Sequence, residues 1–536
     1  MLGVLLRFRL RRDRIQLAVW AVALFALTLL VVVEVRDAFP TVAERAATLR
    51  LLMVTPAILL FRGTPQGTSE GDFVAVLGIS FLALLVGLMC TFLVVRHTRA
   101  EEERGRTELL AATAAGRRTP VLAVVAEGVV ASLLATAAIA AGCLAGGLPS
   151  TGSWLLAAGC GTTGLAFVGI ALLLAQVLPT SRSANGWSAA LVVLAYLLRG
   201  IGDAAGTPHV ATVTLTPAWP SWLSPIGWAQ AVHPFAEDRP WPLLIGVATF
   251  LVCTVIALEV QDRRDVGMAL LAERRGRSRA PRTLRGAFGL AFRLERAGLA
   301  GWVAGLVALA ALLGGLSVVV LQQLQHAGPS IAAAIDALGG HAGTVSQAFA
   351  NIGAAFSGLL AAAVCILGAQ RLRQEEATGG ADSVLSGSTS RVRWMLSVLG
   401  VAAAGATAAL VLGGLAAAAL AGGGEVAPGT WFAAIVWELP AALVFLGLGA
   451  VVFAVLPEAT VPVGWLLFAA AAFLGLYGPV LGLPDWTRQL APFTHSPAIA
   501  LPDPDFTGAW VMTGTAVALV AAATWLFRLR DTAPVG

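Results

Sequence analysis

The chain has 536 residues, of which 58% are hydrophobic and only 12% are charged, and its formal net charge is +5. A soluble domain carries about a quarter charged residues, so this composition excludes a water-soluble protein and indicates an integral membrane protein. All 35 basic residues are arginine, which excludes a lysine-bearing phosphate loop. We therefore expect no ATP hydrolysis by this chain alone. We also expect no nucleic-acid partner, because a basic excess in a membrane protein sets topology.

Twelve apolar runs are long enough to cross the hydrocarbon core as helices, which requires about 20 residues each. They cover residues 15–33, 73–95, 119–146, 152–178, 186–201, 242–260, 299–321, 345–369, 393–421, 430–456, 462–483 and 508–527. The first run is too long for a signal-peptide core and lacks a small-residue cleavage site. The five cysteines lie within these runs and the six histidines are scattered over loops, so we expect neither disulfides nor a metal site.

The arginines orient these spans. If the N-terminus is cytoplasmic, 28 arginines fall in cytoplasmic segments and 7 fall outside. Basic residues accumulate on the cytoplasmic side of membrane proteins. The bias therefore predicts a multi-pass protein of the plasma membrane with both termini in the cytoplasm.

The chain is internally duplicated. Residues 6–12 resemble residues 290–296, residues 99–117 match 373–391 without gaps, and residues 178–187 pair with 456–465. These matches occur in the same order and divide the chain into two six-span halves, 1–260 and 290–536, joined by an arginine-rich cytoplasmic linker at 261–289. Because both halves begin on the same side, they are predicted to be parallel repeats.

The loop after the second span of each half carries the most informative motif. Its six chemically matched residues are Arg99, Glu101, Glu102, Gly105, Glu108 and Arg117 in the first copy, and Arg373, Glu375, Glu376, Gly379, Asp382 and Arg391 in the second. A solvated topology loop needs arginine, but it does not need paired glutamates and a glycine at fixed spacing. We therefore favour a short helix at the cytoplasmic surface with an exposed acidic face over a simple topology loop.

On these residues the chain resembles the permease subunits of type V ABC exporters, and in particular the duplicated permeases of actinobacterial antibiotic-efflux systems of the tetronasin-exporter kind. The resemblance covers essentially the whole chain. It implies an all-α integral membrane fold of twelve transmembrane helices in two parallel six-helix pseudo-repeats. It also implies amphipathic connecting helices at 6–14 and 290–298, and coupling helices at 99–117 and 373–391 that dock on the ATPase.

The resemblance further implies the partners. Two copies of a separate ATP-binding subunit would carry ATP and Mg, this chain would bind no cofactor, and the complex would move amphipathic small molecules such as antibiotics, drugs or lipids outward. The second loop departs from the first, because Ala377, Thr378 and Gly380 stand where the first has Glu103, Arg104 and Arg106. We therefore expect the two docking sites to be energetically unequal.

Two outer segments, 203–241 and 484–507, are rich in tryptophan and proline. This composition is typical of interfacial or re-entrant pieces, and equally of a simple aromatic belt. Six residues of the fifth and eleventh spans are candidates for contact with an apolar substrate, although helix packing is the role we favour for any single one of them. They are Asn185, Trp187, Tyr196, Trp465, Phe473 and Tyr477.

Three carboxylates, Glu127, Glu259 and Glu438, fall within predicted spans. A carboxylate in the membrane usually faces protein or a water-filled cavity, so each could be a cation or proton site or a structural hydrogen-bond acceptor. None has a matched acidic residue in the other half, and we therefore favour the structural role.

The main alternative is a proton-coupled secondary drug carrier of the major-facilitator kind, which also has twelve spans in two parallel halves. The triple glutamate Glu101–Glu103 and the amphipathic segments before the first and seventh spans argue against it. A membrane-embedded lipid-modifying enzyme is a third class, but no histidine cluster or D-x-D motif supports it. We therefore expect a permease and not an enzyme.

Overall fold

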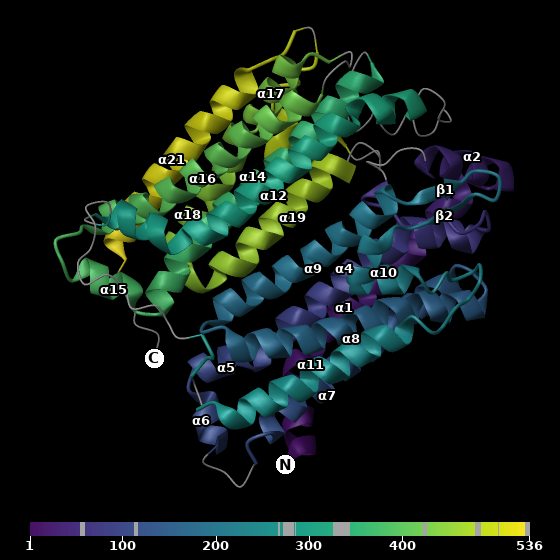
Figure 1. The fold of residues 1–536 in the computed structure, drawn as a ribbon. Coiled ribbons are helices and arrows are strands. Elements are labelled where there is room, and N and C mark those ends of the chain that lie inside the picture. The colour runs from purple at the N-terminus through teal and green to yellow at the C-terminus, as the bar shows by residue number, and fades with distance from the viewer. Residues whose placement is uncertain are drawn as a thin grey trace. The chain divides into compact units, whose positions relative to one another are not determined.

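Helices make up most of the part of the chain that the structure, a computed structural model, describes (Figure 1). The described residues are 1–53, 59–111, 116–265, 268–271, 284, 286–324, 344–421, 426–477, 484–501 and 503–530. Within them, 12 helices are long and apolar enough to cross a membrane. Each coincides with one of the predicted runs, which confirms the twelve spans and the all-α class.

The chain divides into two compact units, Met1–Arg275 and Gly276–Gly536. The boundary falls within the predicted linker, most of which lies outside the described residues. Six of the candidate spans belong to each unit, and each unit has its own hydrophobic core.

The spans of the first unit are α1 (Leu2–Ala38), α4 (Glu70–His97), α7 (Thr119–Ala145), α8 (Ser150–Val177), α9 (Ser181–Ala204) and α11 (Leu243–Arg263). α8 is the central helix, because it packs against α4, α7, α9 and α11. Small residues allow this close packing. A Cβ on Gly164 of α8 would lie 2.7 Å from the side chain of Val86 on α4.

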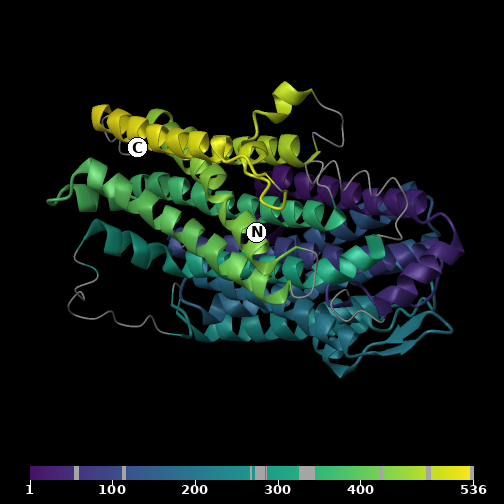
Figure 2. The same cartoon turned by 90° about the horizontal axis from the view of Figure 1, so that it is seen from above.

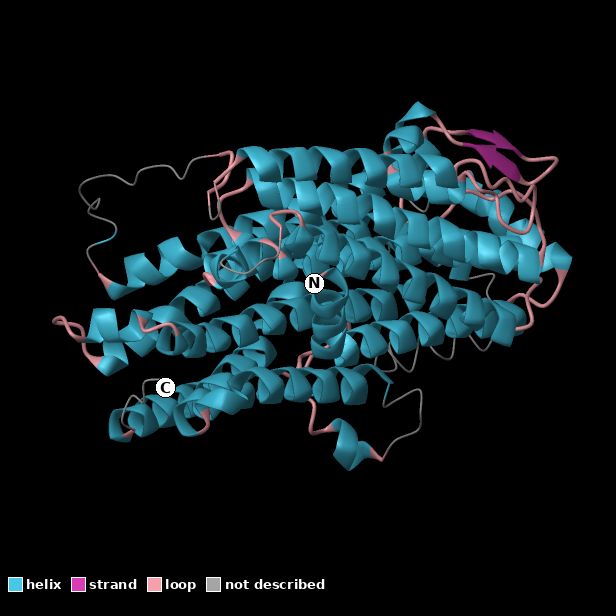
Figure 3. Cartoon of the chain, turned by 90° about the horizontal axis from the view of Figure 1, so that it is seen from below, coloured by secondary structure: helices cyan, strands magenta, loops and turns pink. Residues whose placement is uncertain are grey.

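Short elements connect these spans. They are α2 (Val42–Met53), α5 (Arg99–Glu103), α6 (Arg106–Ala111), β1 (Thr207–His209), β2 (Thr214–Thr216), the 3₁₀ helix η1 (Trp219–Leu223) and α10 (Pro225–Gln230). β1 and β2 form an antiparallel hairpin in which Pro208 pairs with Leu215, and Figures 2 and 3 show it at one end of its unit. α10 packs instead against α8, α4 and α9. The predicted outer segment 203–241 therefore contributes both a hairpin whose first strand is exposed and a buried helix.

The spans of the second unit are α12 (Ala287–Leu324), α14 (Val345–Ala377), α16 (Arg391–Leu420), α17 (Pro428–Val436) with α18 (Leu439–Val455), α19 (Thr460–Tyr477) and α21 (Thr507–Leu529). The predicted run 430–456 is interrupted between α17 and α18, where Pro440 occupies the first turn of α18 and cannot donate a helical hydrogen bond. The short elements are α15 (Gly380–Leu385), η3 (Pro457–Ala459), α20 (Asp485–Arg488) and η4 (Pro492–His495).

The internal repeat is visible in the packing of each unit taken separately. α1 packs on α7 as α12 packs on α16, and α4 packs on α8 as α14 packs on α18. α8 likewise packs on α11 as α18 packs on α21. The duplication found in the sequence is therefore a duplication of the six-helix fold.

The two predicted connecting helices are not separate elements. Residues 6–14 form the first turns of α1, and residues 290–298 lie near the start of α12. No proline interrupts either segment, so the helix continues into the span. The early turns of α1 bury Arg9 and Asp13, whereas Ile15, Val19 and Val22 further along are exposed, as expected of a surface that faces lipid.

Candidate functional site

The first predicted coupling loop is two short helices joined at a glycine, and not one continuous helix. α4 ends at His97, α5 follows at Arg99–Glu103, and α6 begins at Arg106. Gly105 lies between them with φ of +69°, in the left-handed region that is unfavourable for residues with a Cβ. Residues 112–115 of the predicted helix lie outside the described residues.

The second loop repeats this turn. α14 ends at Ala377, Gly379 has φ of +72°, and α15 follows. The N–H of Gly105 donates to the Glu102 carbonyl at 3.0 Å, and the N–H of Gly379 donates to the Glu376 carbonyl at 3.1 Å. The matched glycines of the sequence therefore serve one local conformation, which redirects the chain after the second span of each unit.

A buried ion cluster holds the first loop against its unit. Glu102 accepts from Arg99 Nη1 at 2.8 Å and forms a second ion pair with Arg264, which follows α11. Arg264 Nε also donates to the Gln176 side chain of α8 at 2.5 Å. Arg117 donates to the Arg264 carbonyl at 2.6 Å. The loop is thereby fixed to the ends of α8 and α11.

The second unit contains the same cluster. Glu376 pairs with Arg373 and with Arg530, which follows α21, and Arg391 donates to the Arg530 carbonyl. The motif analysis did not predict that Arg264 and Arg530 contact the two loops. The sequence held one signal for them, because the Arg–Asp pairs at 264–265 and 530–531 also match between the halves.

The expected exposed acidic face is wrong for two of its members. The side chains of Glu102 and Glu376 are only 7% and 5% exposed. Each pairs with two arginines, which are buried in the first unit and 18–19% exposed in the second. Glu101 is also partly covered, and it pairs with Arg12 of α1 at 3.0 Å. The exposed side chains of the two loops include Glu103, Arg104, Arg106 and Glu108 in the first and Thr378, Asp382 and Ser383 in the second.

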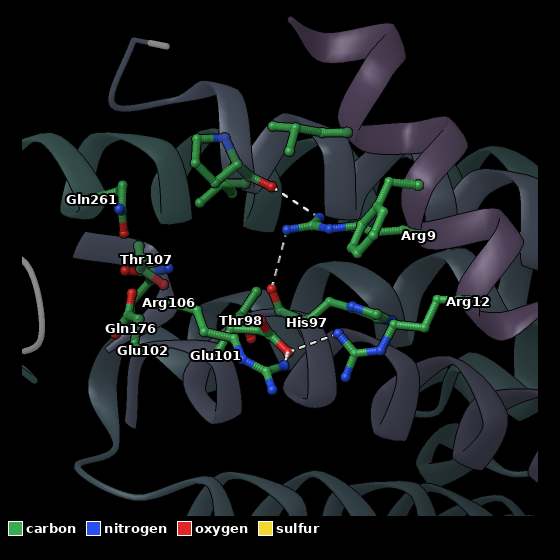
Figure 4. Close-up of a pocket in the computed structure, with 14 residues that line it drawn as sticks. Arg9, Arg12, His97, Thr98, Glu101, Glu102, Arg106, Thr107, Gln176 and Gln261 are labelled. Atoms are coloured by element: carbon green, nitrogen blue, oxygen red, sulfur yellow. Dashed lines mark hydrogen bonds and ion pairs between the residues drawn. The ribbon is translucent and has the colours of Figure 1, made fainter. Parts of the chain in front are cut away.

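A cavity of about 350 Å³ lies beneath the first loop (Figure 4). Arg9 enters it from α1 and donates to the carbonyls of Pro120 at 3.1 Å and His97 at 3.4 Å. Arg12 reaches Glu101 across the cavity, and Leu5 and Phe8 form its apolar part. In the second unit the space lined by α12, Arg371 and Glu375 measures about 20 Å³. The space beside the loop is therefore much larger in the first unit than in the second.

The three predicted intramembrane carboxylates have different surroundings. Glu127 is fully buried and lies near Asp13 and His97. Glu438 is buried and accepts a hydrogen bond from Ser496 at 2.7 Å. Glu259 is not an intramembrane group of this kind, because it is 52% exposed and pairs with Arg118 at 3.2 Å. A hydrogen bond from Arg118 to Asp262 at 2.7 Å raises the pKa of that guanidinium, so this is a surface ion cluster.

The substrate-path candidates whose side chains the structure describes have different surroundings. Trp187 on α9 is 59% exposed, and Asn185 lies two residues before it on the same helix. Tyr196 instead donates to the Phe61 carbonyl at 2.6 Å. In the second unit Trp465 and Phe473 are exposed on α19, and Tyr477 is its last residue, with a side chain outside the described part.

Tyr196 belongs to a buried polar network at the opposite end of the first unit. Arg199 pairs with Asp203 at 3.1 Å, and Ser221 donates to Asp203 at 2.8 Å. Arg199 also donates to the Leu60 carbonyl at 3.1 Å. Tyr196 and Arg199 thus anchor the segment around residues 60–62, which is a structural role.

A family model and a known protein both match this chain. The family model described as "Multidrug efflux system permease Rv1217c, C-terminal domain" matches residues 284–528. The multidrug efflux system permease protein Rv1217c of Mycobacterium tuberculosis (strain ATCC 25618 / H37Rv) is 33% identical over 537 residues. That alignment covers 98% of this chain and 94% of the relative.

Proposed function

The chain belongs to the Rv1217c family of multidrug efflux system permeases, and on this premise we propose that it is the membrane subunit of an exporter driven by a separate ATPase. Two ATPase copies, carrying ATP and Mg, dock on the loops at 99–117 and 373–391. These loops face the cytoplasm of a cell whose plasma membrane holds the twelve spans. The cargo is an amphipathic small molecule such as an antibiotic, a drug or a lipid.

One observation carries this proposal most strongly. Two loops that are far apart in sequence share a left-handed glycine turn and a buried Glu–Arg cluster. Such a cluster makes each loop a rigid extension of its spans, because the second span and the end of the sixth span of that unit meet in it. Force applied to the exposed side of the loop therefore reaches both spans. A loop that served only to set the membrane topology would not need such rigidity.

The transport cycle follows from this connection. Nucleotide binding changes the distance between the two ATPase copies, and the loops transmit that change to the spans. Transport then requires that the inward-open and outward-open arrangements be favoured in different nucleotide states. The loops differ in exposed charge, since Thr378 and Gly380 occupy the positions in the repeat that correspond to Arg104 and Arg106. The two ATPase copies therefore bind with unequal strength.

A charge reversal on the exposed side of both loops tests the proposal. Glu108 and Asp382 are exposed residues in the first turns of α6 and α15. We propose that these carboxylates contact basic side chains of the ATPase. In the variant Glu108→Arg with Asp382→Arg, we therefore expect the affinity for the ATPase to fall at least about tenfold, since like charges across an interface cost several kcal/mol. Drug efflux from cells and drug-stimulated ATP hydrolysis by the purified complex measure the effect.

The matched control is Asp37→Arg with Asp503→Arg. These carboxylates are also exposed, but they lie at the ends of the units away from the loops. The control should bind the ATPase and transport as the wild type does. Normal drug efflux by the loop variant, or uphill transport by vesicles that contain this chain without an ATPase, would contradict the proposal.

A further inference from the structure

Three ionisable side chains from three spans of the first unit meet at one buried point. Asp13 comes from α1, His97 is the last residue of α4, and Glu127 lies on α7. One ligand atom from each lies within 4.8 Å of the others, and all three residues are buried. The sequence analysis expected no metal site because the histidines are scattered, but the fold brings His97 to two distant carboxylates.

The hydrogen bonds within this cluster are incomplete. His97 Nε2 contacts Asp13 Oδ2 and lies 3.6 Å from Glu127 Oε1. A ring nitrogen carries at most one proton, so it cannot serve both carboxylates. Among the described residues, neither carboxylate oxygen of Glu127 has a hydrogen-bond partner, although this side chain is 0% exposed. A buried carboxylate without a partner is costly.

Two arginines lie close to the cluster, but neither forms an ion pair with Glu127. Arg96 pairs with the other oxygen of Asp13, Oδ1, at 3.2 Å. Arg9 uses its guanidinium for the backbone carbonyls of Pro120 and His97. Glu127 therefore has no arginine within ion-pair distance in the described part of the chain, and the centre of the cluster lacks a positive charge.

We propose that Asp13, His97 and Glu127 bind one divalent transition-metal ion of the zinc class. A neutral imidazole and two carboxylates are ligand types that Zn²⁺ accepts, and three protein ligands leave the fourth position to water. The ion neutralises both carboxylates at once. His97 also lines the cavity of Figure 4, which places the cluster beside space that an ion can enter.

The ion would tie α1, α4 and α7 together at the base of the first loop, because α5 begins two residues after His97. The second unit provides an internal contrast. The residues that match Asp13, His97 and Glu127 in the repeat are Ala297, Arg371 and Val401, and Arg371 pairs with Glu375. Zinc therefore stabilises one unit and not its repeat.

Calorimetric titration of Zn²⁺ into the full chain, purified without a polyhistidine tag and stripped by a chelator, tests this site. We expect one ion per chain in the wild type. Glu127→Gln should weaken binding more than about 100-fold, since even residues that only support a metal ligand are worth about 10–100-fold. Glu438→Gln, which changes a buried carboxylate of the second unit, should bind Zn²⁺ as the wild type does.

X-ray absorption of the zinc-loaded wild type needs no variant. It should report one imidazole together with oxygen ligands at about 2.0–2.2 Å. Absence of stoichiometric Zn²⁺ binding, unchanged binding by Glu127→Gln, or a shell of several imidazoles would each overturn the proposal. Stability that depends on pH through Glu127, in a chain that binds no zinc, would assign the cluster to a proton and would overturn it as well.

Discussion

At the scale of single residues, the matched glutamates of the two loops perform different tasks. Glu102 and Glu376 are buried counter-ions for arginines that follow the last span of each unit. Glu108 and Asp382 are exposed and available to a partner. These two groups cannot be distinguished from the sequence, because a matched carboxylate is conserved between the halves whether it pairs with its own chain or with another protein.

Neutralising the buried glutamates should destabilise the units. Glu102→Gln leaves Arg99 and Arg264 without a counter-charge, and removing one partner of a buried pair costs about 3 kcal/mol or more. Glu376→Gln should cost less, because Arg530 is 18% exposed and the remaining charge is better solvated. Denaturant unfolding in mixed micelles measures both, with the exposed Glu108→Gln expected within about 0.5 kcal/mol of the wild type. Equal stability of Glu102→Gln and Glu108→Gln would contradict the assigned role.

At the scale of elements, the glycine turn determines the direction of each loop. A Cβ added to Gly105 or Gly379 would meet no atom within 4 Å, so any effect of substitution comes from the positive φ and not from a clash. The loop motif was predicted as a helix because its residues favour helices, but a left-handed residue ends a helix. The glycine itself was the signal for this break.

Gly105→Ala and Gly379→Ala should each lower the free energy of unfolding by about 1–2 kcal/mol through left-handed strain. We expect their main effect to be a loss of drug-stimulated ATP hydrolysis. Asparagine tolerates this region better than alanine, so Gly105→Asn should recover part of the activity. Gly298→Ala is the control, because Gly298 lies within α12 and also has open space around it. It should be neutral or slightly stabilising. A Gly105→Ala variant with full activity would show that the turn is not needed.

At the scale of the whole molecule, the two units have separate cores and the same internal packing. We therefore expect residues 1–275 and 276–536, co-expressed as two polypeptides, to insert into the membrane and restore drug efflux. Neither fragment alone should transport. Protease resistance of each fragment in membranes measures folding, and a fragment that is degraded unless its partner is present would contradict independent folding.

Membrane class, the twelve spans and the duplication could all be predicted from the sequence, because each depends on the length of an apolar run or on a fixed offset between matched segments. These are local or periodic properties, and no neighbour is needed to recognise them. Two further features depend only on residues within a single helix. The separation of α17 from α18 depends on a proline, and the continuity of α1 depends on the absence of a helix breaker.

The tertiary structure decided which side chains meet. His97 contacts Asp13 across 84 residues, and Arg264 contacts Glu102 across 162, and no spacing rule connects positions that far apart. It also decided that Glu102 is buried whereas Glu108 is exposed, because burial depends on which helix covers a loop. The sequence by itself therefore determined which segments cross the membrane and how many there are. The packing of the helices determined which charged side chains pair with one another and which stay exposed.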